Sequence, residues 1–275
     1  ALAEDLSPIA LSFWRWALAL PILYLLTARE LREQWPVIRR YWKLLAFLAL
    51  ISTAPNHAIV YWALHYTTAI NVQLFNSTIP AWVILIQWAV LRQRPSGGEG
   101  IGLVVSIIGV LAIITAGDLR RLVTLQFNFG DLIILASFTV WSLYAVMLRF
   151  RPSELSPFAF IFTTATFGVV ILLPAFAIDL AVHGFRQGVF PAADARVWGW
   201  LLFIVIGSSV LAATCHSAGV DRIGPARASL FLHLIPVFGA LLSVFVLGEQ
   251  LAWYHAAGFA LVLAGLSIAN RPRSR

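Results

Sequence analysis

The chain has 275 residues, of which 60% are hydrophobic and only 11% are charged, and its mean hydropathy is +0.87. Soluble domains carry about 25% charged residues, so this composition excludes a soluble globular protein and indicates an integral membrane protein. The net charge of +7 does not indicate nucleic-acid binding, because the basic residues lie between apolar runs, where membrane topology places them.

Nine apolar runs are each long enough to form a transmembrane helix, which needs about 20 residues. They are residues 8–28, 43–64, 68–91, 98–116, 130–149, 157–179, 197–219, 225–247 and 254–270. The connections between the runs are too short to hold a soluble domain, and the alternating segments of a membrane β-barrel are absent. The pattern predicts an all-α polytopic membrane protein.

The basic residues predict the orientation of the chain. If successive connections alternate between the two sides, 14 of the 19 basic residues lie on one side and four on the other, and Arg15 lies inside the first run. Cytoplasmic connections are enriched in Lys and Arg, so we expect a cytoplasmic C-terminus and an outside N-terminus. The chain begins at Ala1 and its only methionine is Met147, so we expect one further helix before Ala1.

Two stretches of the chain, 68–91 and 224–247, are similar in sequence. Pro236 stands 156 positions after Pro80, and apolar residues and glycines recur at the same offset. The glycines that coincide are Gly102 with Gly258 and Gly109 with Gly265. This recurrence predicts an internal repeat.

A second pair of motifs places the repeat boundaries. Leu6-Ser7-Pro8 opens one run, and Leu155-Ser156-Pro157 opens another. We expect repeats at 1–117, without its first helix, and at 130–275. Because each complete repeat would have five helices, an odd number, the second copy would enter the membrane inverted. Inverted repeats are typical of alternating-access transporters, whose substrate site lies near the membrane midplane.

The second copy also carries a recognisable pattern, P-A-R-A-S-L…L-I-P-V…L-G-E-Q-L. It resembles the EamA repeat of the drug/metabolite transporter superfamily, and the chain is similar to amino-acid exporters of the YddG type. The resemblance implies ten helices in two inverted repeats, nine of them visible here. It also implies a monomeric, multi-pass protein of the bacterial inner membrane that exports small metabolites, amino acids above all, with no metal, cofactor or nucleic-acid partner.

Polar residues inside apolar runs are costly in hydrocarbon and mark cavities or helix contacts. Pro80 and Pro236 each remove a backbone amide and displace the carbonyl four residues earlier, so we expect a kink in each helix. Near them and in neighbouring runs lie polar and aromatic residues that we expect to line a substrate cavity. These are Asn56, His57, Tyr61, Gln73, Asn76, Ser77, Trp82, Trp141, Tyr144, His216, Ser229 and His233. The alternatives are ordinary interhelical hydrogen bonds and, for the tryptophans, interfacial belts.

The charged residues of the runs bear on mechanism. Arg15 lies about two turns from the outer end of its run, where it could snorkel to the surface, form a structural bond or clamp a substrate carboxylate. No Asp or Glu lies deep inside a visible run, which argues against the small multidrug-resistance branch of the superfamily. The default expectation is facilitated transport without proton coupling.

Other functions remain as alternatives. An enzyme is disfavoured, because the zinc-protease pattern H-E-x-x-H is absent. A channel or scaffold is a further alternative. Within the superfamily, drug, quaternary-amine or nucleotide-sugar transport stands beside amino-acid export. A phosphate-bearing substrate would call for several midplane cations, and only Arg15 is available.

Overall fold

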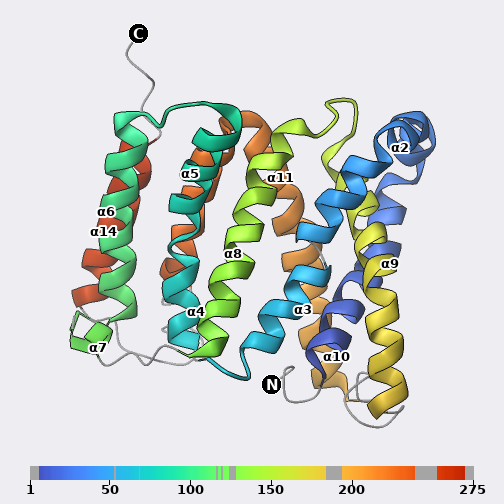
Figure 1. Ribbon diagram of the computed structural model, residues 1–275, viewed down its shortest axis with the longest axis horizontal. Helices are drawn as coiled ribbons and strands as arrows, with labels where there is room; N and C mark the ends of the chain where they lie inside the picture. Colours follow the sequence, from blue (N-terminus) through green and yellow to red (C-terminus); the bar gives the residue numbers. More distant parts are fainter. Residues whose placement is uncertain are drawn as a thin grey trace. The chain divides into compact units, whose positions relative to one another are not determined.

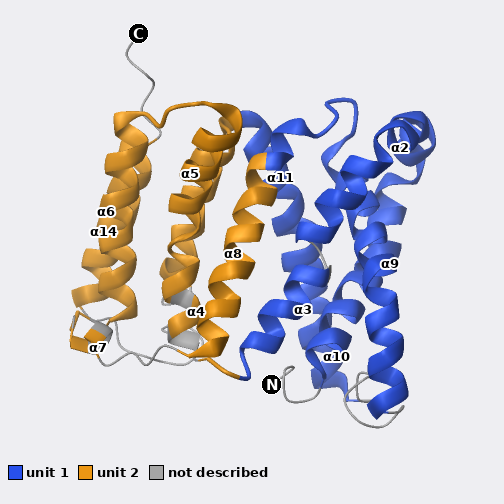
Figure 2. Ribbon diagram, viewed as in Figure 1, with its two compact units in different colours: residues 1–65, 147–222 blue, residues 66–146, 223–275 orange. Residues whose placement is uncertain are grey.

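The computed structural model describes residues 6–52, 54–67, 69–115, 117–118, 120–123, 128–183, 194–238 and 253–269. Every element in these ranges is helical, and the chain divides into two compact units (Figure 2). Unit 1 comprises Ala1–His65 and Met147–Arg222, and unit 2 comprises Tyr66–Val146 and Ile223–Arg275. Each predicted repeat therefore contributes helices to both units.

The described helices agree with the expected membrane spans. Six segments are long and apolar enough to cross a membrane, and the first, Pro8–Ala63, contains two of the expected spans. Two shorter apolar helices, Pro225–Phe238 and Trp253–Ala269, coincide with the last two expected spans over at least part of their length. The prediction of an all-α polytopic membrane protein is confirmed.

Unit 1 is a bundle around the long helix α2. Its described helices are α2 (Pro8–Ser52), α3 (Ala54–Ala63), η1 (Leu148–Phe150), α9 (Pro157–His183), α10 (Ala195–Phe203), η2 (Ile204–Ala212) and α11 (Ala213–Ile223), the last residue of α11 belonging to unit 2. Helix α2 bends on itself: Tyr41 has non-helical backbone angles (φ −104°, ψ 15°), and the helix contains Pro21 and Pro36. The connection expected between the first two spans is thus itself helical (Figure 1).

The two Leu-Ser-Pro motifs begin α2 and α9 in the same way. Ser7 and Ser156 precede the helices, and their hydroxyls accept hydrogen bonds from the amides of Ala10 (3.0 Å) and Ala159 (3.2 Å). A serine cap followed by proline at the first helical position is a strong helix start, because each satisfies or removes an orphan amide. The motifs therefore mark helix starts for a local chemical reason.

Tertiary bonds between α2 and α9 are reciprocal. The Ser7 hydroxyl donates to Asp179 near the end of α9, and the Ser156 hydroxyl donates to Glu30 on α2. Asp179 stands 149 positions after Glu30, and Ser156 stands 149 positions after Ser7. Equivalent residues thus make equivalent bonds at opposite ends of an antiparallel pair, which is the pattern of a local two-fold axis.

Unit 2 contains the remaining described helices. They are α4 (Ala69–Asn76), α5 (Ile79–Leu91), α6 (Gly97–Ile114), α7 (Arg120–Val123), α8 (Phe129–Met147, whose last residue belongs to unit 1), α12 (Pro225–Leu230), η3 (Phe231–His233) and α14 (Trp253–Ala269). Helix α6 begins with a capping box, in which the Ser96 hydroxyl accepts from the Glu99 amide and the Glu99 carboxylate accepts from the Ser96 amide. Such a box satisfies two orphan donors at once.

Glycines let α6 and α14 pack closely, and the two helices lie side by side in Figure 1. A Cβ on Gly102 would stand 2.5 Å from the Gly265 carbonyl oxygen, and one on Gly109 would stand 2.8 Å from that of Gly258. Because Gly102 and Gly258 are equivalent in the repeat, as are Gly109 and Gly265, the contacts are again reciprocal. The pair is antiparallel and has its own local two-fold pattern.

Candidate functional site

Arg15 is the centre of a polar cluster in unit 1. Its guanidinium donates from Nε to the Ser209 hydroxyl (2.7 Å), from Nη1 to the Tyr61 hydroxyl (2.8 Å) and from Nη2 to the Ser208 hydroxyl (2.9 Å). Arg15 is only 5% exposed, so its side chain does not snorkel to the surface. The three hydroxyls come from α3 and η2, and they hold the cation inside the bundle.

The cluster contains hydrogen-bond donors in excess of acceptors. A guanidinium has five N–H groups, and only three have acceptors among the described residues. The hydroxyls of Tyr61, Ser208 and Ser209 each accept from Arg15, and none of them donates to a described group. Nor does any described carboxylate form an ion pair with Arg15. The cluster is therefore complementary to an anion.

The backbone of η2 explains how two neighbouring serines reach one guanidinium. Consecutive residues of an α-helix point about 100° apart, which would direct Ser208 and Ser209 to different sides. Residues Ile204–Ala212 form a π-helix, whose i→i+5 bonds widen the turn and reduce that angle. Ser209 is buried, whereas Ser208 is exposed. Such π segments are frequent at functional sites.

Aromatic rings border the cation. The Arg15 guanidinium carbon lies 5.5 Å from the centre of the Trp16 ring, and the His57 ring lies 5.9 Å from Trp16 and 6.4 Å from Tyr61. The Trp16 indole nitrogen is buried and has no acceptor among the described residues, which adds another donor. Asn56 is buried beside His57 in sequence. Three of the predicted site residues, Asn56, His57 and Tyr61, thus come from α3, which brings Tyr61 to Arg15.

A second polar centre lies in unit 2, at His233. Its Nε2 lies 3.0 Å from the Ser77 carbonyl oxygen and its Nδ1 lies 2.7 Å from the Ser106 hydroxyl. The carbonyl can only accept, so Nε2 carries the proton. His233 is 1% exposed, and its two bonds join η3 to α6 and to the break between α4 and α5. Two of the predicted site residues, Ser77 and His233, are thus in direct contact.

The predicted prolines lie next to interruptions of their helices. Pro80 is in the first turn of α5, directly after the break at Ser77 and Thr78. Pro236 follows the 3-10 segment Phe231–His233. The amides in the first turn of a helix have no partner within the helix, so a proline there costs no hydrogen bond. The breaks therefore lie where the missing proline amides would have had no helical partner.

The other predicted site residues are distributed between the units. His216 is half-buried on α11 in unit 1. In unit 2, the rings of Trp141 and Tyr144 lie 6.3 Å apart on α8, and Ser229 is buried and donates to the Ala226 carbonyl. Asn76 and Trp82 are half-buried. Gln73 belongs to α4, and its side chain lies outside the described residues.

The buried carboxylates in the described part of the chain lie at helix ends and have partners. Asp131 accepts from the Asn71 side-chain amide at 3.0 Å and from the Asn128 backbone amide at 2.8 Å. Glu99 lies 3.5 Å from Arg227. Among the described residues, no group of three His, Cys, Asp or Glu side chains is placed to hold a metal ion.

Sequence reasoning singled out Arg15 but did not assign Ser208 and Ser209 to the site. Their signal was two adjacent serines inside an apolar run, which is costly unless the hydroxyls have a role. The sequence pattern did not predict the π-helix that brings both serines to Arg15. The partners of Arg15 are 46, 193 and 194 positions away, so no local spacing reveals them.

Comparisons with known proteins agree with the fold. The sequence model of the EamA-like transporter family matches residues 1–115 and 128–271. The uncharacterized transporter YyaM of Bacillus subtilis (strain 168) is 25% identical over 264 residues, which are 96% of this chain and 85% of the relative. A probable terminal-alkyne amino-acid exporter of Streptantibioticus cattleyicolor is 24% identical over 233 residues, 83% of this chain and 73% of the relative.

A solved crystal structure shares the fold. It is 18% identical in sequence and has a TM-score of 0.75, over 98% of this chain and 89% of that chain. The family model covers nearly the whole sequence, in two segments that together contain every helix described above except the four-residue α7. The protein is thus a multi-pass membrane protein that belongs to the EamA-like transporter family.

Proposed function

We propose that this transporter exports amino acids or closely similar zwitterions from the cytoplasm across the cell membrane, with its C-terminus on the cytoplasmic side. The observation that carries the proposal is the donor excess around Arg15. A carboxylate offers acceptor oxygens only, and arginine binds carboxylates through two parallel N–H bonds. The two N–H groups that lack acceptors among the described residues are available for such a bond.

The surroundings of Arg15 suit a zwitterion better than a simple anion. Trp16 and Tyr61 contact the cation, and the His57 ring lies beside both of them. An ammonium group is attracted to aromatic faces. The substrate carboxylate would neutralise Arg15, and the ammonium would lie against these rings. Recognition of groups that all amino acids share would allow side chains of different kinds to be accepted.

The relatives support the same class of function. Those named above are described as transporters, and one is described as a probable amino-acid exporter. A cationic drug or quaternary amine is a poorer substrate for this site, because the site itself carries a buried positive charge. A nucleotide sugar would bring two phosphates to a single arginine.

We further propose that transport is facilitative and occurs by alternating access. Proton coupling needs a group that gains and loses a proton during the cycle, and a buried carboxylate is the commonest. The buried carboxylates Glu99, Asp131 and Asp179 lie at helix ends, where each accepts hydrogen bonds. These bonds give the three carboxylates structural roles.

The test is transport by the purified protein in liposomes. Labelled threonine, methionine and phenylalanine are loaded inside or outside, and their flux is followed with and without an imposed pH gradient. We expect saturable flux of all three and equal initial rates with and without the gradient. Strict dependence on the gradient would overturn the facilitative mechanism. Flux of none of the three, with flux of a quaternary amine or a nucleotide sugar, would replace the substrate class.

A further inference from the structure

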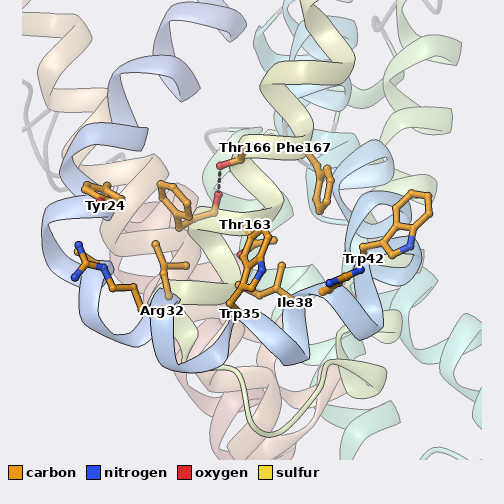
Figure 3. A pocket seen from close by; sticks show the side chains of 12 residues that line it. Tyr24, Arg32, Trp35, Ile38, Trp42, Thr163, Thr166 and Phe167 are labelled. Atoms are coloured by element: carbon orange, nitrogen blue, oxygen red, sulfur yellow. Dashed lines mark hydrogen bonds between the residues drawn. The ribbon is translucent and has the colours of Figure 1, made fainter.

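A groove of about 710 Å³ lies in the concave side of the α2 bend, against α9 in unit 1. Figure 3 shows Tyr24 and Arg32 at one side of it, Trp42 at the other, and Thr163, Thr166 and Phe167 of α9 facing the bend. The remaining lining residues are Ala28, Leu31, Trp35, Ile38, Arg39 and Phe162. A volume of this size is within the range of ligand sites in proteins, roughly 300–1,000 Å³.

The wall of the groove is apolar. Aromatic and aliphatic side chains make up most of it, and its two threonines bond to their own helix. The Thr163 hydroxyl donates to the Ala159 carbonyl at 2.8 Å, and the Thr166 hydroxyl donates to the Phe162 carbonyl at 2.8 Å. The wall therefore offers few polar atoms to a ligand and suits a hydrocarbon chain.

The α2–α9 pair carries different side chains at equivalent positions of its two sides. Thr163 stands 149 positions after Trp14, which makes the two residues equivalent across the local two-fold axis. At the end near Asp179, the indole of Trp14 packs edge-on against Phe176, and Leu201 of α10 joins the cluster. At the equivalent position the small Thr163, which lines the groove, stands in place of the indole.

The rim of the groove is cationic. Arg32 and Arg39 are exposed, and neither forms a hydrogen bond or ion pair with a described residue. The nearby carboxylates are engaged elsewhere: Glu30 accepts from Ser156, and Glu33 pairs with Arg29 at 3.0 Å. The two arginines are therefore available to an anion outside the protein.

We propose that this groove binds an anionic phospholipid, with an acyl chain along the apolar wall and the phosphate against Arg32 and Arg39. The two arginines belong to the basic connection that the positive-inside rule assigns to the cytoplasmic face. The cytoplasmic leaflet carries anionic lipids, and basic pockets beside transmembrane helices bind their head groups. Trp35 and Trp42 are 61% and 50% exposed, as interfacial tryptophans are. The proposal is independent of the transported substrate.

The experiment is native mass spectrometry of the protein, with phosphatidylglycerol and phosphatidylcholine of identical acyl chains added in equal amounts. Two variants remove the same charge: R32Q/R39Q acts at the groove, and R40Q/K43Q changes neighbours that do not line it. We expect the wild type to prefer phosphatidylglycerol, and R32Q/R39Q to weaken its binding by roughly tenfold or more, since each arginine near a membrane surface contributes a severalfold factor. R40Q/K43Q should keep the preference.

A third variant, Thr166→Trp, fills the groove and leaves both arginines in place. We expect it to bind phosphatidylglycerol more weakly than the wild type. Equal binding of the two lipids by the wild type, an equal loss in both double variants, or unchanged binding by Thr166→Trp would each overturn the proposal. A dimer that forms in place of the lipid adduct would assign the groove to a second copy of the chain. Arg32 and Arg39 are exposed, so we expect R32Q/R39Q to fold as the wild type does.

Discussion

The Nε2 atom of His233 lies 3.0 Å from the carbonyl oxygen of Ser77, and the two residues stand 156 positions apart. That separation is the offset of the internal repeat, so the bond joins equivalent positions of the two copies. Equivalent points touch only close to the axis that relates them. Within unit 2, the reciprocal glycine contacts of α6 and α14 have the same origin.

Replacing His233 should lower the stability of unit 2 by the contribution of this hydrogen bond. The Ser77 carbonyl lies in the break between α4 and α5, where helix bonds are missing, and His233→Ala would leave it without its donor. A buried polar group left unsatisfied costs about 1–3 kcal/mol. We expect a lower unfolding temperature in detergent, whereas the same change at exposed His65 should have little effect. An unchanged melting temperature for His233→Ala would contradict the structural role of the bond.

Close packing of α6 on α14 gives a second prediction. Gly109→Ala would place a Cβ 2.8 Å from the Gly258 carbonyl oxygen and 2.9 Å from the Leu261 Cβ. Overpacking of this kind costs about 1–3 kcal/mol. Gly100 lies on the same helix and has nothing within 4 Å of its Cβ position, so Gly100→Ala should be neutral or slightly stabilising. Thermal melts of the two variants provide the comparison, and equal melts would refute the close packing.

The reciprocal serine bonds of unit 1 predict an unequal pair of effects. Ser7→Ala and Ser156→Ala each remove a helix cap, at a cost of about 0.5–2 kcal/mol. Ser7→Ala also takes a donor from Asp179, which is 7% exposed, whereas Glu30 is half-buried. We therefore expect Ser7→Ala to lower the unfolding temperature more. Ser153→Ala, whose hydroxyl lies in an exposed bond, serves as the control. A larger loss for Ser156→Ala would contradict the burial argument.

Helix starts and spans could be predicted because their signals are local. The serine–proline motifs cap α2 and α9 through atoms three residues away, and apolar length alone identifies a membrane helix. The composition of the two units could not be predicted in this way. Each unit contains helices from both predicted repeats, and this arrangement depends on contacts such as Ser7 with Asp179, 172 positions apart.

The candidate site was partly predictable for the same reason. Costly polar residues in apolar runs identified Tyr61, Ser77 and His233, and each takes part in a buried or half-buried network. Their partners were not predictable, since a stripe of polar residues is compatible with a cavity or with a helix contact. His233 forms a helix contact, because it bonds directly to Ser77. The excess of hydrogen-bond donors lies instead around Arg15.

Arg15 gives the prediction that bears most directly on function. If the guanidinium binds the substrate carboxylate, Arg15→Gln should raise the apparent KM for amino acids by about 10- to 150-fold, the equivalent of the 1.5–3 kcal/mol of a hydrogen bond to a charged group. Arg15→Lys keeps the charge but loses the planar fork, so we expect an intermediate KM. Arg29→Gln, at a side chain that is 92% exposed, is the matched control and should leave KM unchanged.

A comparison of threonine with threoninamide separates this role from a purely structural one. The amide lacks the carboxylate, so the wild type should transport threonine with a much lower KM, and Arg15→Gln should reduce that preference toward one. Tyr61→Phe removes one hydroxyl from the cluster and should weaken the preference by a smaller factor, because the guanidinium remains. If Arg15→Gln slowed both substrates equally and left their ratio unchanged, Arg15 would hold α2 to α3 and η2 without touching the substrate.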